Sequence, residues 1–401
     1  MTNQGRTNGV KIASTGLSFE FSEEQKMLRQ MIHNFVEREC PSLAARDLEN
    51  SDEFPRTLFD RMTDAGLHGI GIDEAYGGQG GGIVEQMIVA EELARSLAGL
   101  TWVWGLTSFS GAKTLSLFGS EEQKERMLPA IADGKLIFAI CLTEPGGGTD
   151  VLRAMRTRAK PVDGGWLING TKIWSTGAHE ADRLLVIART NQGARPAEGV
   201  TCFVCDGKAD GVTATPIPKL GMRSVGSCEV VFDNVFVPDE NLVGELDNGW
   251  NQLLATLNNE RIMAAAVATG ILKGVLDDAV EYAMRREAFG KQIGAFQAIQ
   301  HGIADMRTHL DISQLLTYRA AWLQENGLPC GVESAMAKMI ASEYATAGAD
   351  YGIQILGGYG YAQEYNMQRY WRDARLYRIG PVTNEMCRNY IGQSLGLPRS
   401  Y

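Results

Sequence analysis

The spacing of hydrophobic and polar residues divides the chain into three regions. Between about residues 19 and 134, hydrophobic residues recur three and four positions apart, as in amphipathic helices. Ser22-Glu-Glu-Gln25 and Ser120-Glu-Glu-Gln123 have the sequence of a capping box, which closes the first turn of a helix. We expect helices over residues 22–40, 83–97 and 120–131, the first of them with Met27, Met31, Phe35 and Val36 on one face.

The pattern changes between about residues 135 and 247, where short β-prone runs replace the helical period. Trp166–Trp174 contains two such runs on either side of Asn169-Gly170, a dipeptide that favours a hairpin turn. Further runs follow at 184–188, 200–204, 212–217 and 229–237. We expect an antiparallel β unit of roughly six to eight strands.

From about residue 248 the helical period returns. Residues 250–286 predict a helix of unusual length for a globular protein, and further helices are expected over 294–325, 330–356 and 382–395. The fold class is therefore α+β. Its expected parts are an N-terminal helical domain (1–134), a central antiparallel β domain (135–247) and a C-terminal four-helix bundle (248–401).

Composition and charge narrow the functional classes. Of 401 residues, 44% are hydrophobic and 21% charged, and the net charge is −10. A phosphate backbone requires a basic surface, so we expect no nucleic-acid partner. We also expect no membrane span and no secretory segment, because no apolar run is long enough, and hence a cytoplasmic protein. The pair Cys202 and Cys205 lies in a predicted strand, where the two side chains point to opposite faces. We therefore expect packing residues and no metal site.

Four segments contain the candidate binding residues. Several of them are rich in glycine, which has no Cβ and so lets the backbone approach a ligand closely. They are Cys141-Leu-Thr-Glu-Pro-Gly-Gly-Gly-Thr-Asp150, Lys172-Ile-Trp-Ser-Thr176, Arg286-Glu-Ala-Phe-Gly290 with Phe296-Gln297, and Gln354-Ile-Leu-Gly-Gly358. In this order and at these spacings they resemble the acyl-CoA dehydrogenase family. The resemblance covers nearly the whole chain from about Leu17, and it implies the fold of that family.

The resemblance implies FAD as the cofactor and assigns two groups of residues to it. One group would touch the flavin or the thioester, with an aromatic wall beside the isoalloxazine ring: Ile140, Leu142, Thr143, Gly148, Thr149, Trp174, Ser175 and Thr176. The other would reach the pyrophosphate and adenine end of the FAD of a neighbouring subunit: Arg286, Phe289, Gln297, Gln354, Gly357 and Gly358. A shared site implies an oligomer, in the family usually a homotetramer formed as a dimer of dimers.

One segment departs from the family. Its members usually carry their catalytic glutamate in a Tyr-Glu-Gly-Thr segment, and aligning Thr383 with that threonine places Pro381 at the glutamate. Proline cannot abstract a proton and has no N–H, whereas in the family this amide helps to polarise the thioester carbonyl. Gly380 would supply the amide if the loop were shifted by one residue. Thr383 and Glu385 are assigned to flavin contacts.

Glu260 offers a substitute base on the long predicted helix. It falls within an apolar stripe, where burial would raise the pKa of its carboxylate and prepare it as a base near neutral pH. The stripe consists of Leu253, Leu257, Ala264, Val267 and Ile271. The structural alternative is an ion pair with Arg261 or another arginine. A subset of the family, including isovaleryl-CoA dehydrogenase, carries its base on this helix in a matching Glu-Arg pair.

Three functional hypotheses follow. The leading one is α,β-dehydrogenation of an acyl-CoA, with Glu260 removing the α-proton, hydride transfer to flavin N5 and an electron-transfer flavoprotein as acceptor. The resemblance assigns Thr149, Asn258, Arg261 and Gly380 to the substrate. The alternative is a flavin-dependent enoyl-CoA reductase of the crotonobetainyl-CoA reductase type. A non-catalytic flavin-binding protein is disfavoured by the net charge of −10 and the absence of a basic tail.

Overall fold

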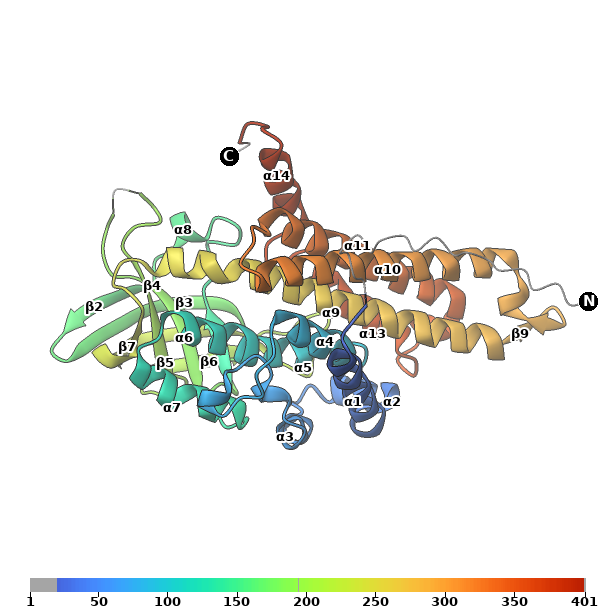
Figure 1. The fold of residues 1–401 in the computed structure, drawn as a ribbon, viewed down its shortest axis with the longest axis horizontal. Helices are drawn as coiled ribbons and strands as arrows, with labels where there is room; N and C mark the ends of the chain where they lie inside the picture. The colour runs from blue at the N-terminus through green and yellow to red at the C-terminus, as the bar shows by residue number, and fades with distance from the viewer. Residues whose placement is uncertain (1–19, 194, 400–401) are drawn as a thin grey trace, which may run out of the picture.

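The computed structural model describes residues 20–193 and 195–399. Helices occupy both ends of the sequence, and a β-sheet lies between them in the chain. Figure 1 shows this sheet at one end of an elongated molecule, from which the long helix α9 (Gly249–Arg285) runs to the small β9 hairpin at the other end. Within the described ranges, no helix combines the length and the apolar character that a membrane crossing requires.

The N-terminal region contains the three expected helices and several more. Both capping boxes are confirmed, because Ser22 and Ser120 each accept a hydrogen bond from the backbone N–H three residues later. On α1, Phe35 and Val36 are buried, whereas Met27 and Met31 are 64% and 40% exposed. The helices are α1 (Glu23–Glu39), α2 (Ser42–Ser51), α3 (Arg56–Asp64), α4 (Ile83–Ala94), α5 (Ala98–Trp104), α6 (Ala112–Phe118) and α7 (Glu121–Ala132), with 3₁₀ turns at Leu67–Gly69 and Glu74–Tyr76 and a π-helix at Gly105–Gly111.

The central sheet has eight strands. They are β1 (Phe138–Cys141), β2 (Arg158–Val162), β3 (Gly165–Thr176), β4 (Arg183–Arg189), β5 (Val200–Asp206), β6 (Val212–Pro216), β7 (Ser227–Pro238) and β8 (Leu242–Val243), with the short helix α8 (Val151–Ala154) between β1 and β2 and a 3₁₀ turn at Asp239–Asn241. Their order is β6-β7-β3-β2-β4-β5-β8, and β1 pairs with β4. Strand β4 runs parallel to both β1 and β2, so the sheet is mixed and not purely antiparallel.

The expected hairpin at Asn169-Gly170 is wrong. Both residues lie inside the continuous strand β3, at a register shift in its pairing with β7. The Asn169 side chain accepts a hydrogen bond from the backbone N–H of Asn234 on β7 at 2.9 Å, so the asparagine links two strands. The turn lies instead at Asp163-Gly164, between β2 and β3, where Gly164 has a positive φ of 72°.

The C-terminal region contains the long helices that the sequence predicts and two that it does not, the four-residue α12 and the longer α13. The helices are α9, α10 (Gln297–Glu325), α11 (Gly331–Leu356), α12 (Gly358–Tyr361), α13 (Met367–Leu376) and α14 (Asn384–Ser394), with the strands β9 (Glu287–Ala288) and β10 (Lys291–Gln292) and a 3₁₀ turn at Ile293–Ala295. Helix α13 has no clean apolar stripe, because Arg369 and Asp373 are both only 1% exposed. Its polar inner face explains why the hydrophobic pattern misses it.

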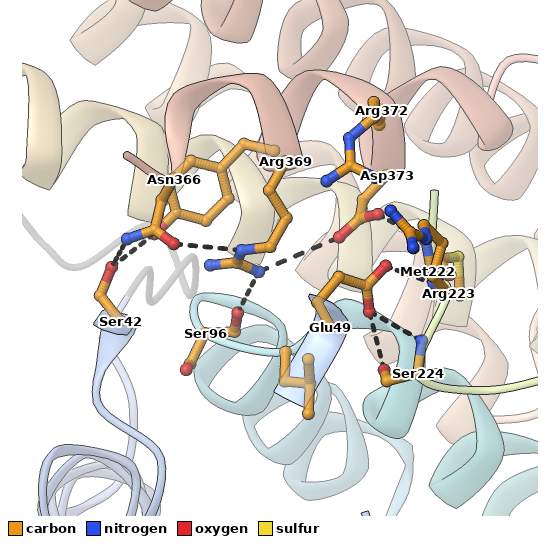
Figure 2. Close-up of polar contacts among 12 residues, drawn as sticks. Ser42, Glu49, Ser96, Met222, Arg223, Ser224, Asn366, Arg369, Arg372 and Asp373 are labelled. Atoms are coloured by element: carbon orange, nitrogen blue, oxygen red, sulfur yellow. Dashed lines mark hydrogen bonds and ion pairs between the residues drawn. The ribbon is translucent and has the colours of Figure 1, made fainter. Parts of the chain in front are cut away.

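Buried polar contacts join the three regions (Figure 2). Glu49 on α2 accepts hydrogen bonds from the backbone N–H and the hydroxyl of Ser224, at 3.1 and 2.7 Å. Asp373 on α13 accepts the backbone N–H of Met222 at 2.6 Å. Both acceptors therefore hold the loop between β6 and β7. This loop fixes the sheet relative to the helices on either side, which positions the elements of the site described next.

Candidate active site

Glu260 lies in the N-terminal third of α9. Figure 1 shows that α9 begins beside the sheet. Its side chain is half-buried, and no hydrogen bond or ion pair to its carboxylate occurs in residues 20–193 and 195–399. Burial raises the pKa of Glu260 to about 7, and the positive charge of Arg261 only partly opposes this effect. The carboxylate is therefore neither neutralised by a cation nor stabilised by donors, which are the conditions that suit a general base.

Arg261 does not form the ion pair that the structural alternative requires. Its Nη1 donates to Asn258 Oδ1 at 3.1 Å, and its guanidinium lies 5.6 Å from the centre of the Tyr390 ring on α14. Asn258 Oδ1 also accepts from the hydroxyl of Ser334 on α11, at 3.3 Å. Asn258 and Arg261 thus lie together, one helical turn apart, where α9, α11 and α14 meet.

The loop that contains Pro381 connects α13 to α14. It is closed by the Asn384 N–H, which donates to Arg378 O at 3.1 Å. Thr383 caps α14, accepting the Met386 N–H at 3.3 Å, and places the exposed Glu385 on the first turn of the helix. The expected role of Gly380 as an amide donor needs correction, because its N–H already donates to Leu376 O at 3.1 Å.

The glycine-rich loop after β1 is fixed by a buried carboxylate. Glu144, 6% exposed, accepts hydrogen bonds from the N–H groups of Arg156 and Thr157 at 2.6 and 2.9 Å, and from Lys172 Nζ at 2.9 Å. Burial alone would raise the pKa of Glu144, but the Lys172 charge and the donors hold it below its usual range. This network ties the loop to β3, which carries the next group of site residues.

An aromatic residue leaves the sheet at an irregularity of β3. The pairing with β7 shifts between Lys172 and Ser175, and within that shift Trp174 has a φ of 63° and is 57% exposed. Ser175 Oγ is buried and, apart from the neighbouring Cys141 thiol, has no hydrogen-bond partner among the described residues, whereas Thr176 Oγ1 lies 3.0 Å from Ser227 Oγ. A large aromatic side chain held outward by a left-handed backbone is unusual, and such positions cluster at ligand sites.

These residues fit a flavin. The Ile173 N–H donates to Thr143 O at 2.8 Å, which holds the loop after β1 beside the segment of Trp174. Ile140, Leu142 and Thr143 are half-buried and Thr149 is exposed. Gly148 has a φ of 80°, and no atom lies within 4 Å of a Cβ built there, so its backbone is open to a ligand. An exposed indole, hydroxyl groups and open backbone on one surface suit a planar heterocycle with polar edges.

The second group of predicted cofactor residues lies at the C-terminal end of α9, away from the residues of β3. Arg286, Gly357 and Gly358 line a cavity of about 780 Å³ together with Tyr282, Ile293, Ile355, Leu356, Tyr359, Ala362, Gln363 and Glu364. Phe289 follows Arg286 by three residues. It has a φ of 53°, and its side chain is 95% exposed. Gln297 and Gln354 are exposed, at the start of α10 and in the last turn of α11.

The two groups are not brought together within one chain. Arg286 follows Glu260 by 26 residues along α9, which at 1.5 Å per residue corresponds to about 39 Å. Figure 1 shows the sheet and the β9 hairpin at opposite ends of this helix. The geometry therefore assigns the two groups to different parts of the protein surface.

Sequence reasoning missed one buried residue beside this site, Lys338 on α11, which is 0% exposed. Its only sequence signal is a lysine within an alanine-rich helix face, next to Ala335, Ala337 and Ala341. Cys202 and Cys205, in contrast, behave as packing residues, since both are buried free thiols in β5. Burial raises the pKa of each thiol to about 12.

Family models match three consecutive parts of the chain. The acyl-CoA dehydrogenase N-terminal domain matches residues 22–135, the middle domain residues 139–235 and the C-terminal domain residues 247–396. The matches occur in chain order and together cover the helices, the sheet and the long C-terminal helices described above.

Named relatives match nearly the whole chain. It is 38% identical to the mitochondrial isovaleryl-CoA dehydrogenase of Oryza sativa subsp. japonica, covering 96% of this chain and 94% of that protein. It is 37% identical to the caffeyl-CoA reductase–Etf complex subunit CarC of Acetobacterium woodii, covering 94% and 99%. Among solved structures, the butyryl-CoA dehydrogenase of Megasphaera elsdenii matches with a TM-score of 0.91 and 33% identity, covering 95% and 100%.

Proposed function

This chain belongs to the acyl-CoA dehydrogenase family, and on that premise we propose that it catalyses the FAD-dependent α,β-dehydrogenation of an acyl-CoA thioester. As a member of this family it is an oxidoreductase and a flavoprotein. The observation that carries the proposal is the unpaired, half-buried carboxylate of Glu260, whose pKa burial raises to about 7. A base with this pKa is largely available at neutral pH and still strong enough to accept a carbon-bound proton.

Glu260 removes the α-proton of the acyl group in this mechanism. FAD, when bound, would supply the hydride acceptor for the β-hydrogen at its N5 atom. Asn258 and Arg261 lie beside Glu260 on α9 and would hold the CoA moiety, which places the acyl chain next to the base. Pro381 carries no ionisable group, so the loop between α13 and α14 offers no competing carboxylate at that position.

Residues of the sheet domain would hold the flavin ring. Trp174 would form one wall, with Ser175 and Thr176 beside it, and the loop of Thr143, Gly148 and Thr149 would cover the reacting end. The group around Arg286 and Gly357 would bind the far end of an FAD in a neighbouring subunit, because about 39 Å of helix separates it from Glu260 in its own chain. The proposal therefore includes a homotetramer in which neighbouring subunits share the cofactor sites. It also includes an electron-transfer flavoprotein as the electron acceptor.

The reverse reaction is the second candidate. The similarity to CarC, a subunit of a caffeyl-CoA reductase–Etf complex, and the absence of a carboxylate at position 381 both support a flavin-dependent enoyl-CoA reductase. In that direction Glu260 would donate the proton to the α-carbon. A pKa near 7 allows either role, because the group is partly protonated and partly ionised at neutral pH.

Anaerobic mixing of the oxidised holoenzyme with a panel of saturated acyl-CoA thioesters tests the proposal. The panel covers straight and branched chains, and the loss of the oxidised-flavin absorbance is recorded for each. We expect at least one thioester to reduce the flavin rapidly. No reduction by any of them, together with reoxidation of the reduced enzyme by an enoyl-CoA, would favour the reductase. A protein that binds no FAD would refute both directions.

A further inference from the structure

A fully buried lysine lies beneath the loop that contains Pro381. Lys338 Nζ donates to the carbonyl oxygen of Val382 at 2.6 Å and to Asn384 Oδ1 at 2.8 Å. Its nearby carboxylate, Glu343, instead pairs with Arg388 at 2.6 Å. In the described part of the chain no carboxylate forms an ion pair with Lys338. Two neutral oxygens are therefore the acceptors of a buried cation, an arrangement that costs folding free energy.

Burial dominates the electrostatics of Lys338. It lowers the pKa of Lys338 to about 8, although Cys387 and Glu385 oppose this shift more strongly than the positive charge of Arg261 adds to it. The ammonium therefore remains charged at neutral pH although its environment disfavours the charge. Local features that reduce stability are expected where function requires them.

The residue that Lys338 holds has a strained backbone. Val382 has a φ of 56°, and a β-branched side chain in the left-handed region is a genuine outlier. The hydrogen bond to its carbonyl oxygen fixes the peptide that joins Val382 to Thr383. Through Asn384, the same ammonium also anchors the first residue of α14. One cation thus fixes both the strained residue and the helix that follows it.

The backbone N–H groups of this loop divide into used and free donors on either side of Pro381. Pro381 has no N–H, and the N–H of Gly380 is used by Leu376 O at 3.1 Å. The N–H groups of Val382 and Thr383 have no acceptor among residues 20–193 and 195–399. Val382 and Thr383 are only half-buried, so a ligand or water can reach these donors. The first two free donors after Pro381 are therefore on the segment that Lys338 holds.

We propose that Lys338 is a positioning residue for the acyl-CoA reaction, holding the Val382 carbonyl so that the free N–H groups of Val382 and Thr383 face the thioester oxygen. This inference rests on the proposed function, because it assigns the donors to the substrate of that reaction. Negative charge develops on the thioester oxygen as the α-proton leaves, and preorganised donors act most strongly on such developing charge. The charge of Arg261, the residue after the base in sequence, acts on Lys338, which brings the segment that carries the base near the lysine that holds the loop.

The experiment compares wild-type holoenzyme with Lys338→Met, which keeps the side-chain length but removes the charge and the donors. Two quantities are measured for both proteins. One is the hydrogen exchange of the peptide covering residues 378–386, and the other is the rate of flavin reduction by an acyl-CoA at saturating concentration. We expect faster exchange in the variant and a reduction rate lower by about tenfold to a hundredfold, the loss typical of a displaced catalytic geometry. The dissociation constant of the acyl-CoA and the flavin content should stay within about twofold, because no contact to either is assigned to Lys338.

Two further variants provide controls. Lys338→Arg keeps a charged donor and should recover part of the lost rate. Lys160→Met removes a solvent-exposed lysine from β2, far from this loop, and should leave the rate and the exchange unchanged. If Lys338→Met does not fold, Lys338→Gln replaces it, since the amide is neutral but can still donate a hydrogen bond.

The outcomes separate this inference from the proposed function. Faster exchange with an unchanged reduction rate would show that Lys338 is only structural, and unchanged exchange would show that it does not hold the loop. Either result overturns the positioning role. A wild-type enzyme whose flavin no acyl-CoA reduces would instead refute the dehydrogenase proposal, whatever the exchange of residues 378–386.

Discussion

Two glutamates beside the expected flavin site lie in opposite electrostatic environments. Glu144, in the loop after β1, is 6% exposed and accepts two backbone N–H groups and the ammonium of Lys172. Glu260, on α9, is half-buried and has no donor within the described residues. Although little of its side chain reaches solvent, Glu144 has a pKa below its usual range, whereas burial raises the pKa of Glu260 to about 7.

The difference shows that burial by itself does not determine the charge of a carboxylate. Donors that stabilise the ionised form outweigh desolvation at Glu144, and their absence leaves desolvation dominant at Glu260. The first arrangement holds a loop in place, because every oxygen of the carboxylate is engaged. The second leaves a carboxylate free to take up a proton. Changing one residue at a time distinguishes these roles.

The largest effect is expected at Glu260. Glu260→Gln keeps the shape of the side chain but cannot accept a proton, so flavin reduction by an acyl-CoA should slow about a thousandfold. Asp277→Asn, on the exposed face of the same helix, makes the same chemical change outside the site and should have no effect. Stopped-flow absorbance measures both rates, and a wild-type rate in Glu260→Gln would mean that another group is the base.

The second effect is on stability. Glu144→Gln leaves the buried ammonium of Lys172 without its counter-charge, and the free energy of unfolding should fall by about 3 kcal/mol, with partial loss of FAD. The double variant Glu144→Gln/Lys172→Met should be less destabilised than the sum of the single changes, because no unpaired charge remains. Denaturant unfolding measures this cycle. Strict additivity would show that the pair is not coupled.

A smaller effect is expected at Trp174, which the Glu144 network places beside the glycine-rich loop. Trp174→Ala should weaken FAD binding about tenfold, because an exposed aromatic wall is lost. Trp174→Phe keeps an aromatic ring and should lose much less. Fluorescence titration of the apoprotein with FAD measures both constants. Equal affinities in the three proteins would remove Trp174 from the cofactor site.

The smallest effect is the pH dependence that Glu260 gives to stability. Its folded-state pKa of about 7 lies above the ordinary value of 4.5, so the folded protein binds more protons between these values than the unfolded chain. Stability from this group is therefore present at low pH and declines as pH rises towards 7, a decline that Glu260→Gln should lack. Over the same range the reduction rate should rise, with a midpoint near pH 7. A flat rate profile would contradict the assignment of Glu260 as the base.

Features of the fold that depend on neighbouring residues in sequence could be predicted. The capping boxes at Ser22 and Ser120 form as expected, because their hydrogen bonds span three residues. The long helix α9 was likewise predicted within one residue at each end. Glu260 was recognised from its place in an apolar stripe, which follows from helical geometry alone.

Predictions failed where partners distant in sequence compete with local preference. Asn169-Gly170 favours a turn, but Asn234 on β7 binds the asparagine and keeps β3 continuous. The hydrophobic pattern does not predict helix α13, because its inner face carries the charged residues Arg369 and Asp373. These are buried through contacts with other regions, among them Ser96 and Met222 (Figure 2).

By itself, the sequence determined the helices with local caps, the resemblance to a family and the two residues that matter most, Glu260 and Pro381. The tertiary structure alone decided that Glu260 has no ion-pair partner in the described chain, that the Gly380 N–H is already used, and that Lys338 holds Val382. The physical reason is that pKa values and hydrogen-bond occupancy depend on which atoms meet in space. Lys338 and Val382, 44 residues apart in sequence, meet only after the helices on either side of the loop have packed.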